Sequence, residues 1–176
     1  SMLELVADGS GQNGKLVTFN QLQWSGNYTL AGVTQIEMEV SNPSSQTLNL
    51  RLAIGTAGNP NMGHWYASTN SMDISPGTTN QIITFDLNAS SMSLTDGSEQ
   101  FDNVISSVSA LRILHSSTVS SKGEPITANL MIDNITAIDP LSNIDENSLS
   151  RINIFPNPVK DWFSFSEKRI INKLEI

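Results

Sequence analysis

Two glutamates, Glu37 and Glu39, stand two residues apart in the run VTQIEMEV. On a β-strand this spacing puts both carboxylates on one face, about 7 Å apart. A retaining glycosidase uses two carboxylates about 5–5.5 Å apart, one on each side of the scissile bond. A solvated strand face is the simpler interpretation, because charged residues normally face water. Glycosidase chemistry at this pair is therefore the weaker alternative.

Aromatic side chains give a second indication of chemistry. Trp65 and Tyr66 follow a glycine and a histidine in a loop-like stretch, and Trp24 and Tyr28 form a second pair. Flat rings pack against the C–H face of a sugar while neighbouring polar groups bind its hydroxyls. The alternative is that these rings fill the core. We take Trp65, Tyr66 and Trp24 as candidate ligand contacts.

Two arginines, Arg51 and Arg112, fall in the middle of strand-like runs and face away from most of the aliphatic pattern. Together with Asn49, Asn129 and the two glutamates, they are candidates for a polar sheet face that holds a glycan. A mutually paired, solvated charge face is the alternative.

The alternation of residues predicts strands rather than helices. Residues 34–54 contain two alternating runs, with Ile36 and Met38 in the first and Leu50 and Leu52 in the second, around an Asn-Pro-Ser-Ser connection. This pattern predicts a β-hairpin with one apolar face and one polar face. Similar runs cover residues 81–87, 108–115 and 126–138, whereas 55–72 and 88–103 look like loops, with a helical turn near Phe101. About seven or eight strands predict an all-β sandwich over residues 3–138.

Composition restricts the classes of partner. The chain has 176 residues, a formal net charge of −8 and no cysteine, so disulfides and thiolate metal sites are excluded. An acidic chain with scattered basic residues argues against nucleic acid as a partner. No apolar run approaches the roughly 20 residues that span a bilayer. The sequence contains neither a Gly-x-Ser-x-Gly elbow nor a phosphate-binding loop.

The segment Ile132-Asp133-Asn134-Ile135 closes the last of these runs. In this motif and in its overall texture, the part up to residue 138 is similar to the galactose-binding-like jelly rolls of carbohydrate-binding modules. The resemblance implies a jelly-roll fold and a structural Ca²⁺ held by Asp133 against the N-terminal segment. Because loops rich in Gly, Asp and Asn supply oxygen ligands, Asp8 in the stretch ADGSGQNG is a second candidate ligand.

The C-terminal residues differ in character from the rest. Residues 139–150 are polar and acidic and predict a linker. Residues 151–176 contain Phe155, Pro156, Asn157 and Pro158, where the two prolines must interrupt a strand. This motif resembles the opening of the type IX secretion C-terminal sorting domain of Bacteroidetes, a β-rich tail that is truncated here. The resemblance implies recognition by the type IX secretion machinery and a secreted or surface-attached protein.

These observations predict a non-catalytic polysaccharide-binding module of a secreted or cell-surface protein. Two alternatives remain open: a structural spacer domain without its own ligand, and a glycosidase that uses Glu37 and Glu39.

Overall fold

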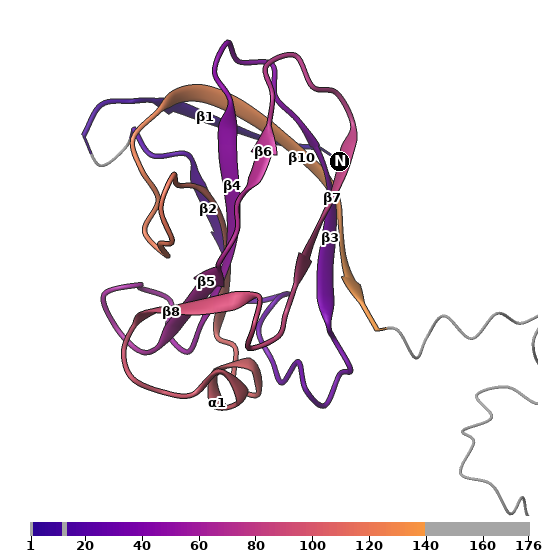
Figure 1. Ribbon diagram of the computed structural model, residues 1–176, viewed down its shortest axis with the longest axis vertical. Coiled ribbons are helices and arrows are strands. Elements are labelled where there is room, and N and C mark those ends of the chain that lie inside the picture. Colours follow the sequence, from indigo (N-terminus) through magenta and orange to yellow (C-terminus); the bar gives the residue numbers. More distant parts are fainter. Residues whose placement is uncertain (1, 12–13, 140–176) are drawn as a thin grey trace, which may run out of the picture. The chain divides into compact units, whose positions relative to one another are not determined.

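Two antiparallel β-sheets pack face to face in the computed structural model, which describes residues 2–11 and 14–139 (Figure 1). The first sheet has the order β1 (Leu3–Asp8), β10 (Thr127–Ile138), β3 (Gln35–Ser41) and β7 (Gln81–Asp86). The second has the order β2 (Val17–Asn20), β9 (Ala110–His115), β4 (Leu48–Gly55), β5 (Trp65–Ser68) and β8 (Met92–Asp96), with β6 (Met72–Ile74) paired to β4. One short helix, α1 (Phe101–Ile105), precedes β9. This order is that of a jelly roll, so the predicted β-sandwich is confirmed.

The main core lies between the two sheets. Alternate residues of β3, among them Ile36 and Met38, meet alternate residues of β4, among them Leu50 and Leu52, and all four are fully buried. The period-two pattern of the sequence is the cause, because it places one aliphatic face on each strand. Within the described residues no helix is long and apolar enough to cross a membrane.

The predicted hairpin over residues 34–54 is wrong. β3 pairs with β10 and β7, whereas β4 pairs with β9, β5 and β6, so the two runs belong to opposite sheets. Asn42 holds the connection between them, because its side-chain amide donates to the carbonyls of Gln46 and Ile74 at 2.8 and 2.9 Å. Two amphipathic runs can bury their apolar faces against each other across a sandwich as well as side by side in one sheet.

The second face of β4 is also buried, contrary to the expectation of a polar face. Arg51 and Ala53 point away from the main core, yet only 5% and 0% of their surfaces are exposed. Ala53 belongs to a second, smaller apolar cluster with Trp65, Ala67, Ala110 and Leu114. This cluster covers the outer side of the second sheet.

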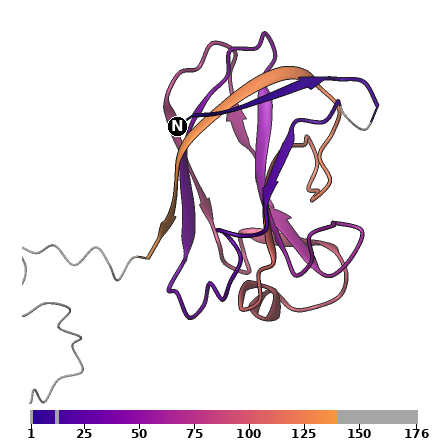
Figure 2. The ribbon, with the colours of Figure 1, turned by 180° about the vertical axis from the view of Figure 1, so that it is seen from behind.

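Some segments expected to be loops form strands. β5 lies within residues 55–72, β6 begins at the last of them, and β8 lies within 88–103. In contrast, residues 21–24 and 28–30 form no strand. The helical turn expected near Phe101 is α1. Seen from behind, β1 and β10 run side by side along one edge of the sandwich (Figure 2).

The described residues all belong to the first of two units into which the chain divides, residues 1–143. Most of the predicted linker, and the whole predicted sorting segment with Phe155, Pro156, Asn157 and Pro158, lie outside the described residues.

Candidate functional site

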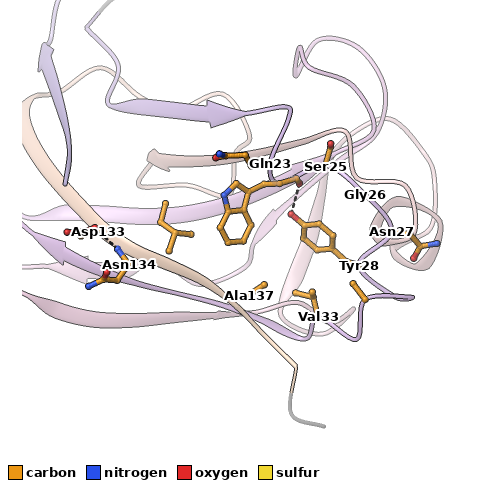
Figure 3. Close-up of a pocket in the computed structure, with 12 residues that line it drawn as sticks. Gln23, Ser25, Gly26, Asn27, Tyr28, Val33, Asp133, Asn134 and Ala137 are labelled. Carbon is orange, nitrogen blue, oxygen red and sulfur yellow. Dashed lines mark hydrogen bonds between the residues drawn. The ribbon is translucent and has the colours of Figure 1, made fainter. Parts of the chain in front are cut away.

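A groove of about 770 Å³ lies between the loop that connects β2 to β3 and the C-terminal half of β10 (Figure 3). Its apolar lining comes from Trp24, Tyr28, Val33, Ile135 and Ala137. Its polar lining includes Gln23, Asn27, Asp133 and Asn134. An apolar cavity of this size with a few polar groups is typical of a small-molecule or sugar site.

Hydrogen bonds fix the loop that carries Trp24. The side-chain oxygen of Asn20 accepts from the backbone N–H groups of Leu22, Gln23 and Trp24 at 3.0, 2.9 and 3.2 Å. The Tyr28 hydroxyl donates to the carbonyl of Trp24 at 2.7 Å. The Trp24 ring is partly buried and packs against the main core. The groove wall is therefore largely preformed, which lowers the entropy cost of binding.

The middle of the same loop is anchored to α1 and to the segment between α1 and β9. Gly26 exchanges backbone hydrogen bonds with Val108 at 2.7 and 3.0 Å, and the Tyr28 N–H donates to the carbonyl of Ile105 at 3.1 Å. Burial raises the pKa of Tyr28 to about 12. Its hydroxyl therefore stays protonated and keeps the hydrogen bond to Trp24 at physiological pH.

A β-bulge in β10 shapes the opposite wall. Asp133 pairs with Glu39 and Thr136 with Glu37, so β10 has one residue more than β3 between these pairs. Asn134 has φ = 51°, a left-handed conformation that asparagine tolerates better than most residues. The extra residue reverses the alternation. As a result Ile135 and Ala137 line the groove.

Two carboxylates flank the bulge on the outer face of the first sheet. The backbone N–H of Asn134 donates to Asp133 Oδ1 at 2.9 Å, and its side-chain amide donates to Glu39 Oε2 at 3.0 Å. Figure 3 shows Asp133 and Asn134 at one end of the groove and Asn27 at the other. β1 pairs with β10 only as far as Ile132, and the groove begins beyond that point.

Trp65 and Tyr66, the first pair of candidate contacts, lie in the interior. Trp65 is 0% exposed, and its indole N–H donates to the carbonyls of Asn59 and Met62 at 3.3 and 3.0 Å. Tyr66 is 9% exposed, packs edge-on against Phe101 and donates its hydroxyl to the carbonyl of Glu99 at 2.8 Å. The interpretation of these two rings as core residues therefore describes this arrangement better than sugar contact does.

Arg51 and Arg112 lie on the same outer face of the second sheet as Trp65. The Arg51 guanidinium donates to the backbone carbonyls of Ser68, Thr69, Ser116 and Ser117, at 2.8 to 3.3 Å. Arg112 donates to the carbonyl of Ser121 at 2.9 Å, and its guanidinium carbon lies 5.8 Å from the centre of the Trp65 ring. The structure thus brings three of the predicted ligand contacts, Trp65, Arg51 and Arg112, close together. They lie around the small apolar cluster. Only Trp24 of the predicted contacts lines the groove.

Asp8 and Asp133, the candidate calcium ligands, are far apart. Asp8 pairs with Thr127, and Asp133 stands six residues further along β10, a separation of about 20 Å. The Asp8 carboxylate accepts hydrogen bonds from the backbone and hydroxyl of Ser10, both at 2.9 Å, and these bonds lower its pKa. Among the described residues no group of three or more His, Asp or Glu side chains could hold a metal ion. The two aspartates cannot share one ion, so the calcium prediction depends on Asp133 without Asp8.

Glu37 and Glu39 lie on the outer face of the first sheet, as the alternation predicts. Glu39 accepts its hydrogen bond from Asn134, and neither glutamate is part of the groove lining.

The sequence did not predict that β10 lines a groove, although it indicated Asp133 as a candidate metal ligand. Only the turn signal Ser25-Gly26-Asn27 and the Asp133-Asn134 pair indicated these regions. Their proximity depends on a bulge and on the jelly-roll connections, which pair residues about a hundred positions apart.

The solved structures that are similar to this chain include PfGH50B and the agarase AgWH50C. PfGH50B has a TM-score of 0.54 and 12% sequence identity over 79% of this chain, which corresponds to 20% of that chain. The agarase AgWH50C has a TM-score of 0.48 and 11% identity over 79% of this chain and 21% of its own. This chain therefore spans about a fifth of the length of each. The likeness is one of fold. No protein-family model matches the chain, and no curated protein does.

Proposed function

We propose that this domain is a non-catalytic carbohydrate-binding module and that its groove at Trp24 binds a polysaccharide. The observation that carries the proposal is the groove itself, in which a partly buried indole and apolar side chains are combined with polar residues such as Gln23 and Asn27. Sugar rings require such a combination, because one face is apolar and the edge carries hydroxyls.

The comparison with PfGH50B is in keeping with this role without assigning it. Its name places that protein in glycoside hydrolase family 50. The region that matches this chain makes up about a fifth of PfGH50B. A domain of this fold within a glycoside hydrolase is one setting in which a carbohydrate-related role would arise. The proposal depends on the groove rather than on this likeness.

A pull-down on insoluble polysaccharides, followed by titration with soluble oligosaccharides, tests the proposal. Trp24→Ala should weaken binding at least about tenfold, the loss of about 1.4 kcal/mol. Because Trp24 also packs against the core, a second variant is needed. Ala31→Trp adds bulk at an exposed position of the groove lining and should block binding without lowering the melting temperature.

The matched control is Leu22→Ala, since Leu22 lies on the same loop, is 86% exposed and does not line the groove. Absence of binding across a wide polysaccharide panel would contradict the proposal and favour a structural spacer. Turnover of a bound polysaccharide that Glu37→Gln abolishes would favour the glycosidase instead.

A further inference from the structure

The strand β10 has an unpaired edge where it borders the groove. β1 pairs with β10 only as far as Ile132, whereas β10 continues to Ile138. From Asp133 onward its pairing is with β3, on the other side. Among the residues that the structure describes, no strand follows β1 along this edge. The edge borders the groove, because Ile135 and Ala137 belong to the groove lining.

Main-chain groups of two residues face this edge. The carbonyl of Ile138 accepts from the N–H of Thr34, which precedes β3, at 2.9 Å, so the backbone of Ile138 faces β3. In an antiparallel ladder the backbone groups of successive residues point to opposite sides. Those of Ala137 and Ile135 therefore point toward the edge, about 7 Å apart along the strand. In the described part of the chain they bond to no loop and no side chain.

The loop wall of the groove has few polar groups left for a ligand. The side-chain oxygen of Asn27 already accepts from the N–H of Leu30 at 2.9 Å, and its NH2 group has no partner within the described residues. The Tyr28 hydroxyl donates to the carbonyl of Trp24. A sugar hydroxyl both donates and accepts hydrogen bonds. The β10 edge adds both kinds of group, since each of its two residues offers an N–H and a C=O.

An extended peptide can also pair with a free strand edge, but this edge is short and irregular. The bulge at Asn134, where φ is 51°, separates it from the β1 ladder. A bulge disrupts the ladder that an added strand requires and protects an edge against such pairing. The rings of Trp24 and Tyr28 on the opposite wall suit the apolar face of a sugar. The observations therefore favour a sugar over a peptide.

We propose that the groove binds at least two consecutive sugars of a linear polysaccharide, and that the main-chain groups of Ile135 and Ala137 bind their hydroxyls. This inference rests on the proposed function of the groove. Polar groups are spread along its length, from the β10 edge to Asn27 at one end (Figure 3). Its volume of about 770 Å³ suits a ligand larger than one sugar ring.

Hydrogen exchange followed by NMR tests the proposal directly. The ligands are linear galactan and glucan hexasaccharides, with galactose and glucose for comparison. The N–H groups of Ile135 and Ala137 should exchange rapidly in the free protein, and a bound hexasaccharide should slow their exchange at least about tenfold. The single sugars at the same concentration should slow neither. Thr136 is the internal control, because its N–H faces β3 and should be protected with or without ligand.

Calorimetric titration of variants supplies a second measurement. Ala137→Pro removes the N–H that faces the edge, and an edge position tolerates such a proline. Its affinity for the hexasaccharide should fall about three- to tenfold, the loss of one hydrogen bond. The matched control is Ala137→Val, which adds similar bulk, keeps the N–H and should lower the affinity less than about twofold. Melting temperatures of both variants show whether the fold is intact.

Trp24-dependent binding of a hexasaccharide that leaves the exchange of Ile135 and Ala137 unchanged would overturn the role of the edge alone. Equal affinities of Ala137→Pro and Ala137→Val, or single sugars that bind as tightly as the hexasaccharides, would also overturn this inference. Protection of the edge by an alternating Val-Thr hexapeptide, and by no sugar, would show strand addition instead. Binding that survives Trp24→Ala, or no binding of any saccharide, would overturn the proposed function as well.

Discussion

Gly55 lies directly opposite Trp65 in the ladder between β4 and β5, and a Cβ at Gly55 would overlap the indole ring. The absence of a side chain at position 55 lets the ring lie flat on the second sheet. Residues 56–64 then cover it, since the indole N–H donates to two carbonyls of that loop. Trp65 is therefore the centre of the small apolar cluster.

Trp65→Ala should lower the free energy of unfolding by about 3–5 kcal/mol, because it opens a large cavity in a buried cluster. Urea denaturation monitored by circular dichroism measures the change. The matched control is Phe19→Ala on the same sheet, where the ring is 58% exposed and the loss should be below about 1 kcal/mol. A Trp65→Ala protein of normal stability that no longer binds glycan would restore the sequence-based prediction for this residue.

Arg51→Lys should also destabilise the fold, by about 2–3 kcal/mol. The planar guanidinium serves carbonyls from two separate segments, residues 68–69 and 116–117. A lysine ammonium cannot reach all of them, and buried carbonyls would lose their donors. Urea denaturation again measures the loss. The control is Lys122→Met, which removes an ion pair with a half-exposed lysine and should cost less than about 1 kcal/mol. An Arg51→Lys protein as stable as that control would contradict this role.

The alternation of aliphatic residues was enough to predict which side of β3 and β4 faces the core. Met38 and Leu50 lie there because a strand exposes alternate residues to opposite sides. The same pattern could not reveal that the two runs belong to different sheets, since it describes faces and not pairing partners. For that reason the predicted hairpin was wrong while the sandwich was right.

The site was harder to predict than the fold. Whether Trp65 or Trp24 reaches the surface depends on which loop covers which ring, and both have a glycine, a serine and an asparagine within four residues in the sequence. Ile135 lines the groove because the bulge at Asn134 inserts one extra residue into β10. A one-residue bulge reverses the side-chain pattern of a strand, and its position is not visible in residue periodicity.

A calcium ion at Asp133 remains a prediction, and it has a specific thermal signature. An ion that binds only the folded state stabilises it by about 2.7 kcal/mol at a hundredfold excess over Kd. Chelator should then lower the melting temperature of the wild type, and Asp133→Ala should remove the difference. Asp8→Ala is the control and should retain it, because Asp8 lies at the opposite end of the strand pair. Identical melting curves with and without chelator would exclude a stabilising ion.

The sorting role of residues 151–176 is a proposal that depends on sequence resemblance. A fluorescent protein with a signal peptide, fused to the native sequence from residue 139 onward, should leave the periplasm of a type IX-competent host. Replacement of Pro156 and Pro158 by alanine should reduce export, since both prolines define the motif. Fractionation of cells and medium measures the outcome. Cargo that the unaltered segment leaves in the periplasm would refute the role and the predicted localisation.

Glu124 organises the loop after β9 and should make the fold sensitive to acid. Burial raises the pKa of its carboxyl, but hydrogen bonds from Ser117, Ser116 and Thr118 outweigh this effect, and the pKa falls to about 2 from 4.5. The unfolded chain therefore binds the proton more readily than the folded one. Stability from this group is fully present above pH 4.5 and is lost as the pH falls toward 2.

Glu124→Gln should reduce the pH dependence of the melting temperature between pH 4.5 and 2.5. The hydroxyls of Ser117 and Ser116, which donate at 2.7 and 3.0 Å, would meet a neutral amide at every pH. Because the carboxyl is only partly buried, solvent screening makes the effect modest. The control is Glu4→Gln, at an exposed glutamate of β1, which should leave the slope unchanged. Equal slopes in both variants and the wild type would show that the hydrogen bonds to Glu124 do not stabilise the loop.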